Sequence, residues 1–388
     1  MALKRQRLAD RRRAVGHTQE SLAEKLGVDR TTVVRWERAE SDPQPWARPR
    51  LADALQVPLE KITELLEDIG EVNTRRTERL GHALRSPRAV DLATAAQLRD
   101  ELDVLTLRYD STPSTALLPN AVRLHADIAL FRAHASAVEV RRALARVHAT
   151  SLILLGQLVW DASQRRDRTT TVAYYEQATS AARQGDDLLQ EAHARLRSGY
   201  VALYADRDLR RGLAQAAQAT ELAHRFGSHA LAGLATLHVG EAHAMLGDRS
   251  ACDRALGDAG RELGVTPETD PCRPLVAAAQ FARVAGSCYL SLGDARKAET
   301  LLEAAMTQLS DRTKSRAITS GNLALARLRQ REIDGAVVAL HAGVDVVERT
   351  RAGGGMNVLF KVGRELRPWR GRVDVQEVTD RLFQLMAG

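Results

Sequence analysis

A pattern of small residues that recurs through the second half of the chain constrains its fold more than any other feature. In the segment LATLHVGEAHAMLGDRSACDRALGDA, Gly240 is followed by the pair Gly247-Asp248. In ARVAGSCYLSLGDARKAETLLEAA, Gly286 and Gly293 take the same places. Small residues at these offsets let the two helices of a hairpin approach closely, and a Gly-Asp pair turns the chain between them. The pattern therefore predicts consecutive helical hairpins.

The repeat extends over five copies, each marked by a small residue in its first helix. These anchors are Gly156, Gly199, Gly240, Gly286 and Ala324. They lie 43, 41, 46 and 38 residues apart. The scheme resembles the tetratricopeptide repeat, and because its spacing exceeds the standard ~34 residues, we expect extended helices or turns. The resemblance implies a tetratricopeptide-like α-solenoid, closed by a flexible turn at Gly353–Gly355 and a C-terminal capping helix.

Stacked helical hairpins form a superhelix with a concave face that commonly binds a peptide or a partner helix. The first helix of each repeat lines this face, so its polar and aromatic residues are candidates for contact with an effector: a peptide, a small molecule or a protein. The candidates are His193, Arg197, Tyr200, Tyr204, His238, Glu241, His243, Tyr289, Asn322 and Arg327. Packing between helices, or simple solvation, is the alternative for each of them.

Length and charge set broad limits on the chain's organisation and partners. At 388 residues the chain is too long for one small core, so we expect two or more domains. The net charge of +7 suits a polyanionic partner without requiring one. Only six of the 56 basic residues are lysines. Because a GC-rich genome produces the same arginine and alanine bias, we discount it as evidence of nucleic-acid binding.

Several classes of function lack support in the sequence. Cys252, Cys272 and Cys288 have no metal-ligand spacing, which favours reduced thiols in a cytosolic protein. No histidine cluster has a complete set of ligands, no Ser/His/Asp or Cys/His arrangement is evident, and no Gly-Lys-Ser/Thr follows the glycines of the C-terminal segment. No apolar run approaches the ~20 residues of a membrane span. We expect a cytoplasmic, nucleoid-associated protein that is not an enzyme and needs neither metal nor cofactor.

The first seventy residues predict five short helices. In TQESLAEKLGVDRTTVVRWERAE, Thr18 can cap one helix and Gly27 can end it with a left-handed residue. Asp29 is a strong N-cap for the next helix, which buries Val33 and Trp36. A basic segment, KRQRLADRRRAVG, should form a helix before these two, and PRLADALQVPLEKITELLED should form two after them.

These residues resemble the phage-repressor helix-turn-helix family, also called the Cro/C1 or xenobiotic-response-element family. The resemblance covers about Leu3 to Leu66 and includes the Gln-x-x-Leu-Ala turn, the Gly-Val pair, Trp-Glu and Leu-Ala-x-Ala-Leu. Ser21 departs from it, since the family often has a capping-box glutamate there, and we expect a weaker cap. Joined to the repeats, this layout resembles peptide-sensing regulators of Gram-positive bacteria and, more closely, large actinobacterial regulators of development and secondary metabolism.

The resemblance assigns roles within the third helix. Its first residues, Arg30 and Thr31, and Arg35 one turn later would meet base edges in the major groove, where arginine can bind guanine. Gln19 would touch the backbone or an adjacent base. Contacts to phosphates or flanking groups would come from Thr18, Thr32, Val34, Arg38 and Arg48.

Two of these assignments have alternatives. Val34 either touches a thymine methyl group or is a half-exposed valine. Glu37 would turn inward and pair with Arg12; the alternative is that Arg11, Arg12 and Arg13 form a solvated basic face, and we expect pairing for Arg12 alone.

We therefore expect an all-α protein with a five-helix DNA-binding domain (1–68), a linker and connecting helix (69–112) and a tetratricopeptide-like domain (113–388). Its expected function is sequence-specific regulation of transcription, with repeats that dimerise, sense an effector, or both. A single small domain buries too little surface for strong specific binding, so we expect a homodimer on a palindromic operator with half-sites ~10 bp apart or a multiple of it. The alternative is a protein-interaction scaffold with a non-reading helix-turn-helix.

Overall fold

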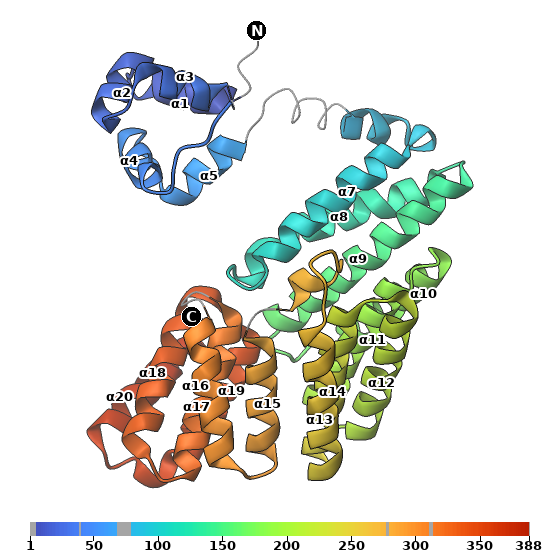
Figure 1. Ribbon diagram of the computed structural model, residues 1–388, viewed down its shortest axis with the longest axis vertical. Coiled ribbons are helices and arrows are strands. Elements are labelled where there is room, and N and C mark those ends of the chain that lie inside the picture. The colour runs from blue at the N-terminus through green and yellow to red at the C-terminus, as the bar shows by residue number, and fades with distance from the viewer. Residues whose placement is uncertain (1–4, 39, 68–78, 277–278, 310–312, 388) are drawn as a thin grey trace. The chain divides into compact units, whose positions relative to one another are not determined.

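The computed structural model describes the chain except for residues 1–4, 39, 68–78, 277–278, 310–312 and 388. The described part is helical and contains no strand (Figure 1). It divides into two compact units, Met1–Ser86 and Pro87–Gly388. The predicted linker and connecting helix, 69–112, spans this boundary. Residues 79–85 are helical in the first unit, and α7 (Leu92–Arg108) belongs to the second. The limits at residues 68 and 113 stay predictions.

Five helices of the first unit precede the segment 68–78, as the sequence predicts. They are α1 (Gln6–Ala14), α2 (Gln19–Leu26), α3 (Arg30–Glu37), α4 (Ala47–Ala54) and α5 (Leu59–Glu67). Their shared core contains Leu22, Leu26, Val33, Trp36, Leu51, Leu55 and Ile62. Leu3, where the family resemblance begins, lies outside the described residues.

The turn from α2 to α3 follows from local chemistry. The Thr18 hydroxyl accepts the backbone N–H of Ser21 at 3.0 Å, and the Ser21 hydroxyl accepts the N–H of Thr18 at 2.9 Å. Serine therefore completes a capping box that was expected to be weakened by the absence of glutamate, because its oxygen is also an acceptor. Gly27 ends α2 with φ of 70°, and Asp29 caps α3 by accepting the N–H of Thr31 at 2.7 Å.

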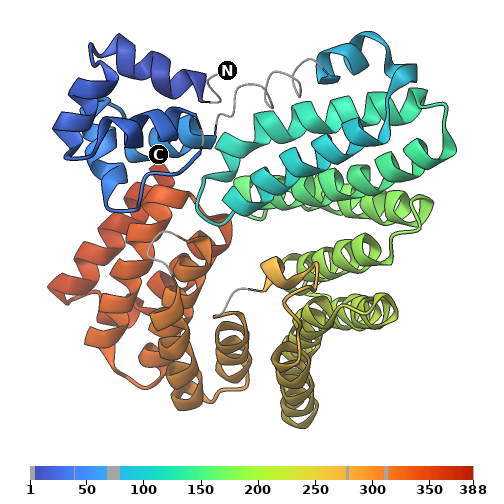
Figure 2. The same ribbon diagram turned by 45° about the horizontal axis from the view of Figure 1, so that its top comes forward.

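The second unit consists of consecutive helix pairs (Figures 1 and 2). They are α7 (Leu92–Arg108) with α8 (Ser114–His134), α9 (Val138–Ala162) with α10 (Arg168–Gln184), α11 (Leu188–Val201) with α12 (Leu209–Phe226), α13 (His229–Met245) with α14 (Arg249–Gly264), α15 (Gln280–Ser291) with α16 (Ala295–Gln308), α17 (Lys314–Arg329) with α18 (Ile333–Thr350), and α19 (Gly353–Glu365) with α20 (Val373–Ala387). Three 3-10 turns, η1 (Pro87–Ala89), η3 (Arg273–Leu275) and η4 (Arg367–Trp369), and one π-helical turn, η2 (Ala202–Asp206), lie between these helices. All five predicted anchors fall in the first helix of a pair, which confirms the helical repeat.

The small residues of the repeat are needed for close packing. A Cβ atom on Gly286 would lie 2.7 Å from Cγ of Leu302, and one on Gly156 would lie 2.5 Å from Cε1 of Tyr175. Gly293 turns the chain between its two helices with φ of 81°. The last repeat has Arg331 at that place, with φ of 65°, so the turn geometry is kept even without glycine. A larger side chain at Gly156 or Gly286 would force the paired helices apart.

The helix α9 is long and apolar enough to span a membrane by composition, although the sequence analysis noted no such run. In the structure 78% of its apolar 18-residue window is buried against other helices. The neighbours of α9 are α7, α8, α10, α11 and α19. Its hydrophobicity is therefore that of a helix at the centre of a protein core.

A buried ion pair with its hydrogen bonds joins early and late parts of the repeat domain. Lys314 Nζ donates to Oδ2 of Asp161 and to Oγ of Ser114, both at 2.8 Å. The other Asp161 oxygen accepts the N–H of Gly353 at 2.8 Å. Lys314 and Asp161 are 3% and 4% exposed. The pairs α17–α18 and α19–α20 are thus tied to α8 and α9, so the stack of repeats returns on itself.

The glycines Gly353–Gly355 differ from expectation. They form the first turn of α19 and are buried, whereas the sequence suggested a flexible turn. A Cβ on Gly353 would collide with the Asp161 carbonyl oxygen, and one on Gly355 would lie 2.6 Å from Cβ of Ala317. Glycine is required here because α19 starts directly against two other helices.

Separating the charges of Lys314 and Asp161 should destabilise the repeat domain. Lys314→Met leaves the Asp161 carboxylate buried without its cation, and we expect a loss of about 3–5 kcal/mol in unfolding free energy. Asp161→Asn should cost a similar amount, and the double variant should lose clearly less than the sum of the two. Hydrogen exchange in α7–α20 under increasing urea measures these losses.

The matched control is Arg123→Ala, which removes an exposed pair with Glu101 at 3.7 Å and should cost ~1 kcal/mol or less. Additive losses for Lys314→Met and Asp161→Asn would contradict the coupling of the two side chains.

Candidate functional site

The third helix, α3, is held against α1 by a buried ion pair. Glu37 is 1% exposed, and its Oε1 accepts a hydrogen bond from Nε of Arg12 at 2.7 Å. Arg12 also donates to the carbonyl oxygen of His17 at 2.7 Å, and Gln19 Nε2 donates to Oε2 of Glu37 at 2.6 Å. The expected Arg12–Glu37 pair is therefore present. It neutralises the one carboxylate within α3.

Two further arginines are structural, and here the sequence interpretation needs correction. Arg11 donates to the carbonyl oxygens of Leu55 and Gln56 at 2.9 and 2.7 Å, so the expectation that only Arg12 leaves the solvated face is wrong. Arg5, which the sequence did not single out, is 6% exposed and donates to the Trp36 carbonyl oxygen at 2.9 Å. Both supply donors to carbonyl groups at helix ends, which lack partners within their own helices.

The opposite face of α3 is open. Arg30, Thr31 and Arg35 are exposed, and within the described part of the chain neither guanidinium group forms a hydrogen bond or an ion pair. The Thr31 hydroxyl donates to Oδ1 of Asp29 at 2.6 Å and keeps its lone pairs. This bond, together with the one from the Thr31 N–H, holds the pKa of Asp29 below its usual value. Three predicted base-contacting residues thus lie together on one exposed helical face.

The other residues predicted to contact DNA differ in exposure and in the hydrogen bonds that they already form. Gln19 has one N–H of its amide bound to Glu37, which leaves its second N–H and its oxygen available. Arg38 is exposed and lies 3.9 Å from a carboxylate oxygen of Glu40. Arg48 donates from Nε to the carbonyl oxygen of Pro43 at 3.2 Å and keeps its terminal nitrogens. Thr18 takes part in the capping box, and Thr32 and Val34 are half-buried.

A second group of candidates comes together in the repeat domain, where α11 contacts both α9 and α13. It contains six of the ten effector-site candidates: His193, Arg197, Tyr200, Tyr204, His238 and Glu241. Tyr204 lies in η2, a π-helical turn of a kind often found at functional sites. We call these six residues, with Arg165 and Arg283, which belong to the same network, the polar cluster.

Ring contacts and hydrogen bonds connect the members of the polar cluster. The rings of Tyr200 and His238 are 4.4 Å apart between centroids. His238 Nδ1 lies 2.7 Å from Oε2 of Glu241, which also accepts a hydrogen bond from the Tyr204 hydroxyl. Arg197 lies over the Tyr200 ring, 5.4 Å from its centroid. The network runs across α11, η2 and α13.

The two arginines that the sequence analysis missed extend this network. Arg165, between α9 and α10, lies 5.3 Å from the centroid of the Tyr204 ring. Arg283 of α15 influences the ionisation of Tyr200 and Glu241. Its position one turn before the anchor Gly286 could have identified it. Nothing in the loop sequence distinguishes Arg165 from its arginine neighbours.

Burial and charge set the ionisation of the cluster. Burial lowers the pKa of His193 to about 3, and the adjacent Arg197 adds to this effect, so His193 is neutral at physiological pH. Burial raises the pKa of Tyr200 to about 12 against the opposing effect of Arg197 and Arg283. For Glu241, burial favours the neutral acid, but hydrogen bonds from His238 and Tyr204 outweigh it and lower the pKa. The cluster therefore contains one carboxylate and three guanidinium groups.

Two predicted effector residues lie outside the polar cluster. The Tyr289 hydroxyl donates to Oδ1 of Asp253 at 2.6 Å, beneath the Lys297 ammonium group. Asn322 donates to the hydroxyl of Ser287 at 2.7 Å. The last two effector candidates of the sequence analysis also lie outside the cluster. Arg327 is paired with Glu299 and Glu303, and His243 is half-buried. Periodicity identified their helices but not the neighbours that their side chains meet.

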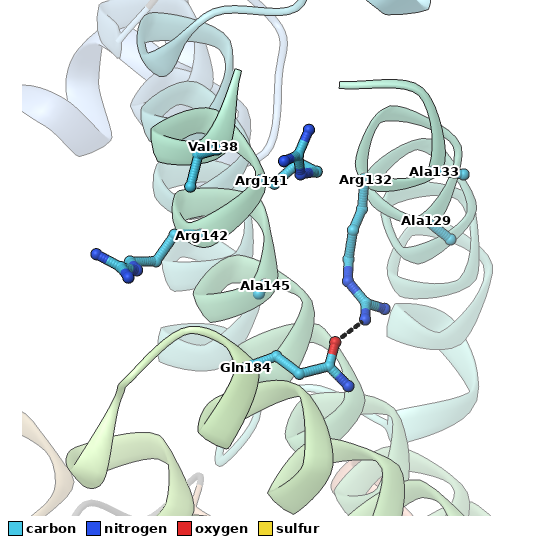
Figure 3. Close-up of a pocket in the computed structure, with 8 residues that line it drawn as sticks. All are labelled: Ala129, Arg132, Ala133, Val138, Arg141, Arg142, Ala145 and Gln184. Atoms are coloured by element: carbon cyan, nitrogen blue, oxygen red, sulfur yellow. Dashed lines mark hydrogen bonds between the residues drawn. The ribbon is translucent and has the colours of Figure 1, made fainter. Parts of the chain in front are cut away.

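The described residues also form an open hollow of about 470 Å³ at the surface of α8, α9 and the end of α10 (Figure 3). Its arginines are already bound within the chain. Arg132 donates to Gln184, Arg141 donates to the carbonyl oxygens of Ala135 and Ser136, and Arg142 pairs with Asp186. No predicted residue lines it, and it is a weaker candidate than the polar cluster. Within the described parts of the chain, no three His, Cys, Asp or Glu side chains gather to hold a metal ion.

Comparison with known proteins identifies the first unit. Residues 8–62 match the helix-turn-helix family. The predicted N-terminal helix-turn-helix DNA-binding domain is therefore confirmed, as is its combination with an all-helical repeat domain. No curated protein sequence matches the chain.

Two solved structures are similar to most of the chain. One is Bacillus thuringiensis PlcR in complex with the peptide PapR7 and DNA, with 16% identity and a TM-score of 0.32; the match covers 68% of this chain and 95% of that one. The other is a Rap protein complexed with Competence and Sporulation Factor, with 11% identity and a TM-score of 0.43; the match covers 76% of this chain and 98% of that one.

Removing the cation of the Arg12–Glu37 pair should destabilise the first unit. Arg12→Met leaves the Glu37 carboxylate buried, and we expect a loss of about 3–5 kcal/mol in unfolding free energy. Arg13→Met removes an exposed arginine 3.2 Å from Asp10 and should cost ~1 kcal/mol or less. Hydrogen exchange in α1–α5 measures both. Equal losses in the two variants would contradict a structural role for Arg12.

Proposed function

We propose that this chain, with a helix-turn-helix domain at residues 8–62, is a sequence-specific DNA-binding transcription regulator whose repeat domain binds an effector. One observation carries the proposal: Arg30, Thr31 and Arg35 lie exposed on α3, and both arginines lack partners among the described residues. Arg5, Arg11 and Arg12, by contrast, are bound within the domain. Arg30 and Arg35 therefore have no structural partner among the described residues.

In such a domain the N-terminal end of the recognition helix enters the major groove. Arg30 or Arg35 can then donate two hydrogen bonds to O6 and N7 of a guanine, and Thr31 can contact a neighbouring base. Arg38, Arg48 and Thr32 are placed to bind phosphates, which fixes the orientation of α3 but reads no sequence. Burial of Glu37 in its ion pair removes a negative charge that DNA would repel.

We further propose that the regulator is a homodimer that acts in the cytoplasm, on the nucleoid. One small helix-turn-helix domain buries too little surface for strong specific binding, and two domains double the contacts. The repeat domain, as the larger part of the chain, supplies much of the dimer contact. An effector regulates the protein only if it binds one arrangement of the two DNA-binding domains more tightly than the other.

Replacing Arg30 and Arg35 tests the reading of bases. A duplex selected from a random-sequence pool by the wild-type protein serves as the specific target. Where Arg30 or Arg35 contacts a guanine, its replacement by alanine removes both hydrogen bonds to that base. The replacement should therefore weaken binding to this duplex by ~1–3 kcal/mol. Binding to an unselected duplex should change less. Fluorescence anisotropy at fixed salt measures both affinities.

The control is Arg210→Ala, which removes the same charge from an exposed position on α12. It should leave both affinities unchanged. If Arg30→Ala and Arg35→Ala weaken binding to both duplexes equally, these arginines are phosphate contacts. If the wild-type protein selects no sequence at all, the scaffold alternative replaces the regulator.

The dimer is tested by mass and by the selected sequence. Light scattering should give about twice the chain mass of 42.5 kDa. Selected duplexes should carry an imperfect palindrome with half-sites ~10 bp apart, or a multiple of it, because two domains related by a two-fold axis meet the same groove face. A monomeric mass together with a single unrepeated site would exclude the dimer.

A further inference from the structure

The charges of the polar cluster do not balance within the chain. Arg165, Arg197 and Arg283 are half-buried, and none of them lies within ion-pair distance of a carboxylate in the described part of the chain. Glu241 is the one carboxylate in the cluster, and it is bound by His238 and Tyr204. Partly buried cations without counter-ions are costly, so they favour a bound anion.

Two buried nitrogen atoms of the cluster also lack hydrogen-bond partners. They are Nε of Arg165 and Nε2 of His238, and His238 is only 3% exposed. Nδ1 of His238 is already engaged with Glu241, which leaves Nε2 as the free end of the imidazole ring. Unsatisfied buried polar atoms are rare in native proteins and call for a specific explanation, such as a missing ligand. These two nitrogens mark both ends of the network, in the α9–α10 loop and on α13.

The arginine side chains of the cluster are held ready for a flat or tetrahedral anion. Arg197 lies over the Tyr200 ring, and its Nε donates to Nε2 of His193 at 3.2 Å, so its terminal nitrogens remain available. Arg165 lies over the Tyr204 ring in the same way. Contact with a ring restricts each guanidinium group, which lowers the entropy lost when it binds an anion through two hydrogen bonds.

We propose that the polar cluster is the effector site of this regulator and that its ligand is a small organic anion, whose carboxylate or phosphate group is bound by Arg165, Arg197 and Arg283. The inference deepens the proposed function, because it names the chemical class of the effector on which that function depends. Tyr200, Tyr204 and His238 flank the remainder of the ligand.

The position of Arg165 connects this site to the contact that joins early and late repeats. Its guanidinium group lies against Gly354, where no Cβ would fit. The preceding residue, Gln164, accepts a hydrogen bond from Asn357 of α19 at 3.1 Å. An anion that draws Arg165 toward Arg197 therefore changes the packing of α19 on the end of α9. Ligand binding would alter the packing of the repeats through this contact.

Calorimetric titration of the full-length protein tests the anion site. The probes are citrate, for the carboxylate, and inorganic phosphate, each measured against sodium chloride at matched ionic strength. We expect saturable binding to the wild type and at least a tenfold weaker Kd for Arg197→Gln and for Arg283→Gln. Arg210→Gln, an exposed control on α12 with the same charge change, should bind as the wild type does. Tighter binding of citrate identifies a carboxylate ligand, and tighter binding of phosphate identifies a phosphorylated one.

Hydrogen exchange adds a second measurement that also reports on folding of the variants. The probe that binds should slow exchange in α11 and α13, and in the first turn of α19, for the wild type but not for Arg197→Gln. Equal protection in both proteins, or none beyond that from sodium chloride, would overturn the anion site. If the wild type binds the anion but selects no DNA sequence, the regulator fails and the site stands; selection of DNA without anion binding gives the reverse.

Discussion

The repeat domain depends on a single buried carboxylate, that of Asp161. It receives hydrogen bonds from Lys314 at the start of α17, from Ser114 at the start of α8 and from the backbone of Gly353 at the start of α19. A charge in such a place is stable only when its partners are complete. The carboxylate therefore specifies how the last repeats return to the second helix pair. Arg165, four residues further along the chain, is consequently held against α19.

The same rule about buried charge separates structural from functional residues in both units. In the first unit Glu37 and Arg12 neutralise each other, and Arg11 serves the carbonyl groups at the end of α4. Arg30 and Arg35, by contrast, are exposed and have no partner among the described residues. In the repeat domain the excess of positive charge is larger and partly buried, because the polar cluster contains three guanidinium groups and one carboxylate. In each unit the proposed ligand is an anion that would compensate this positive charge.

Much of the fold could be predicted because its signals are local. Caps such as Thr18 and Asp29, the turn at Gly27 and the anchors at Gly240 and Gly286 act within one or two helical turns, and the structure contains all of them. Six of the ten effector candidates lie close together for a related reason: they belong to, or directly follow, the first helices of two neighbouring repeats. Prediction failed where a side chain reaches a distant group.

Sequence alone therefore determined the helix-turn-helix, the succession of paired helices and the exposed position of Arg30, Thr31 and Arg35 on α3. Tertiary structure decided which charges are compensated. Lys314 and Asp161 are 153 residues apart, and Arg11 meets carbonyl groups 44 and 45 residues away. No local pattern specifies such partners, because a buried charge or an unpaired carbonyl group can be satisfied by any donor that packing brings near. Gly353–Gly355 form the first turn of a helix because the neighbouring helices, rather than the flexibility of glycine, set their conformation.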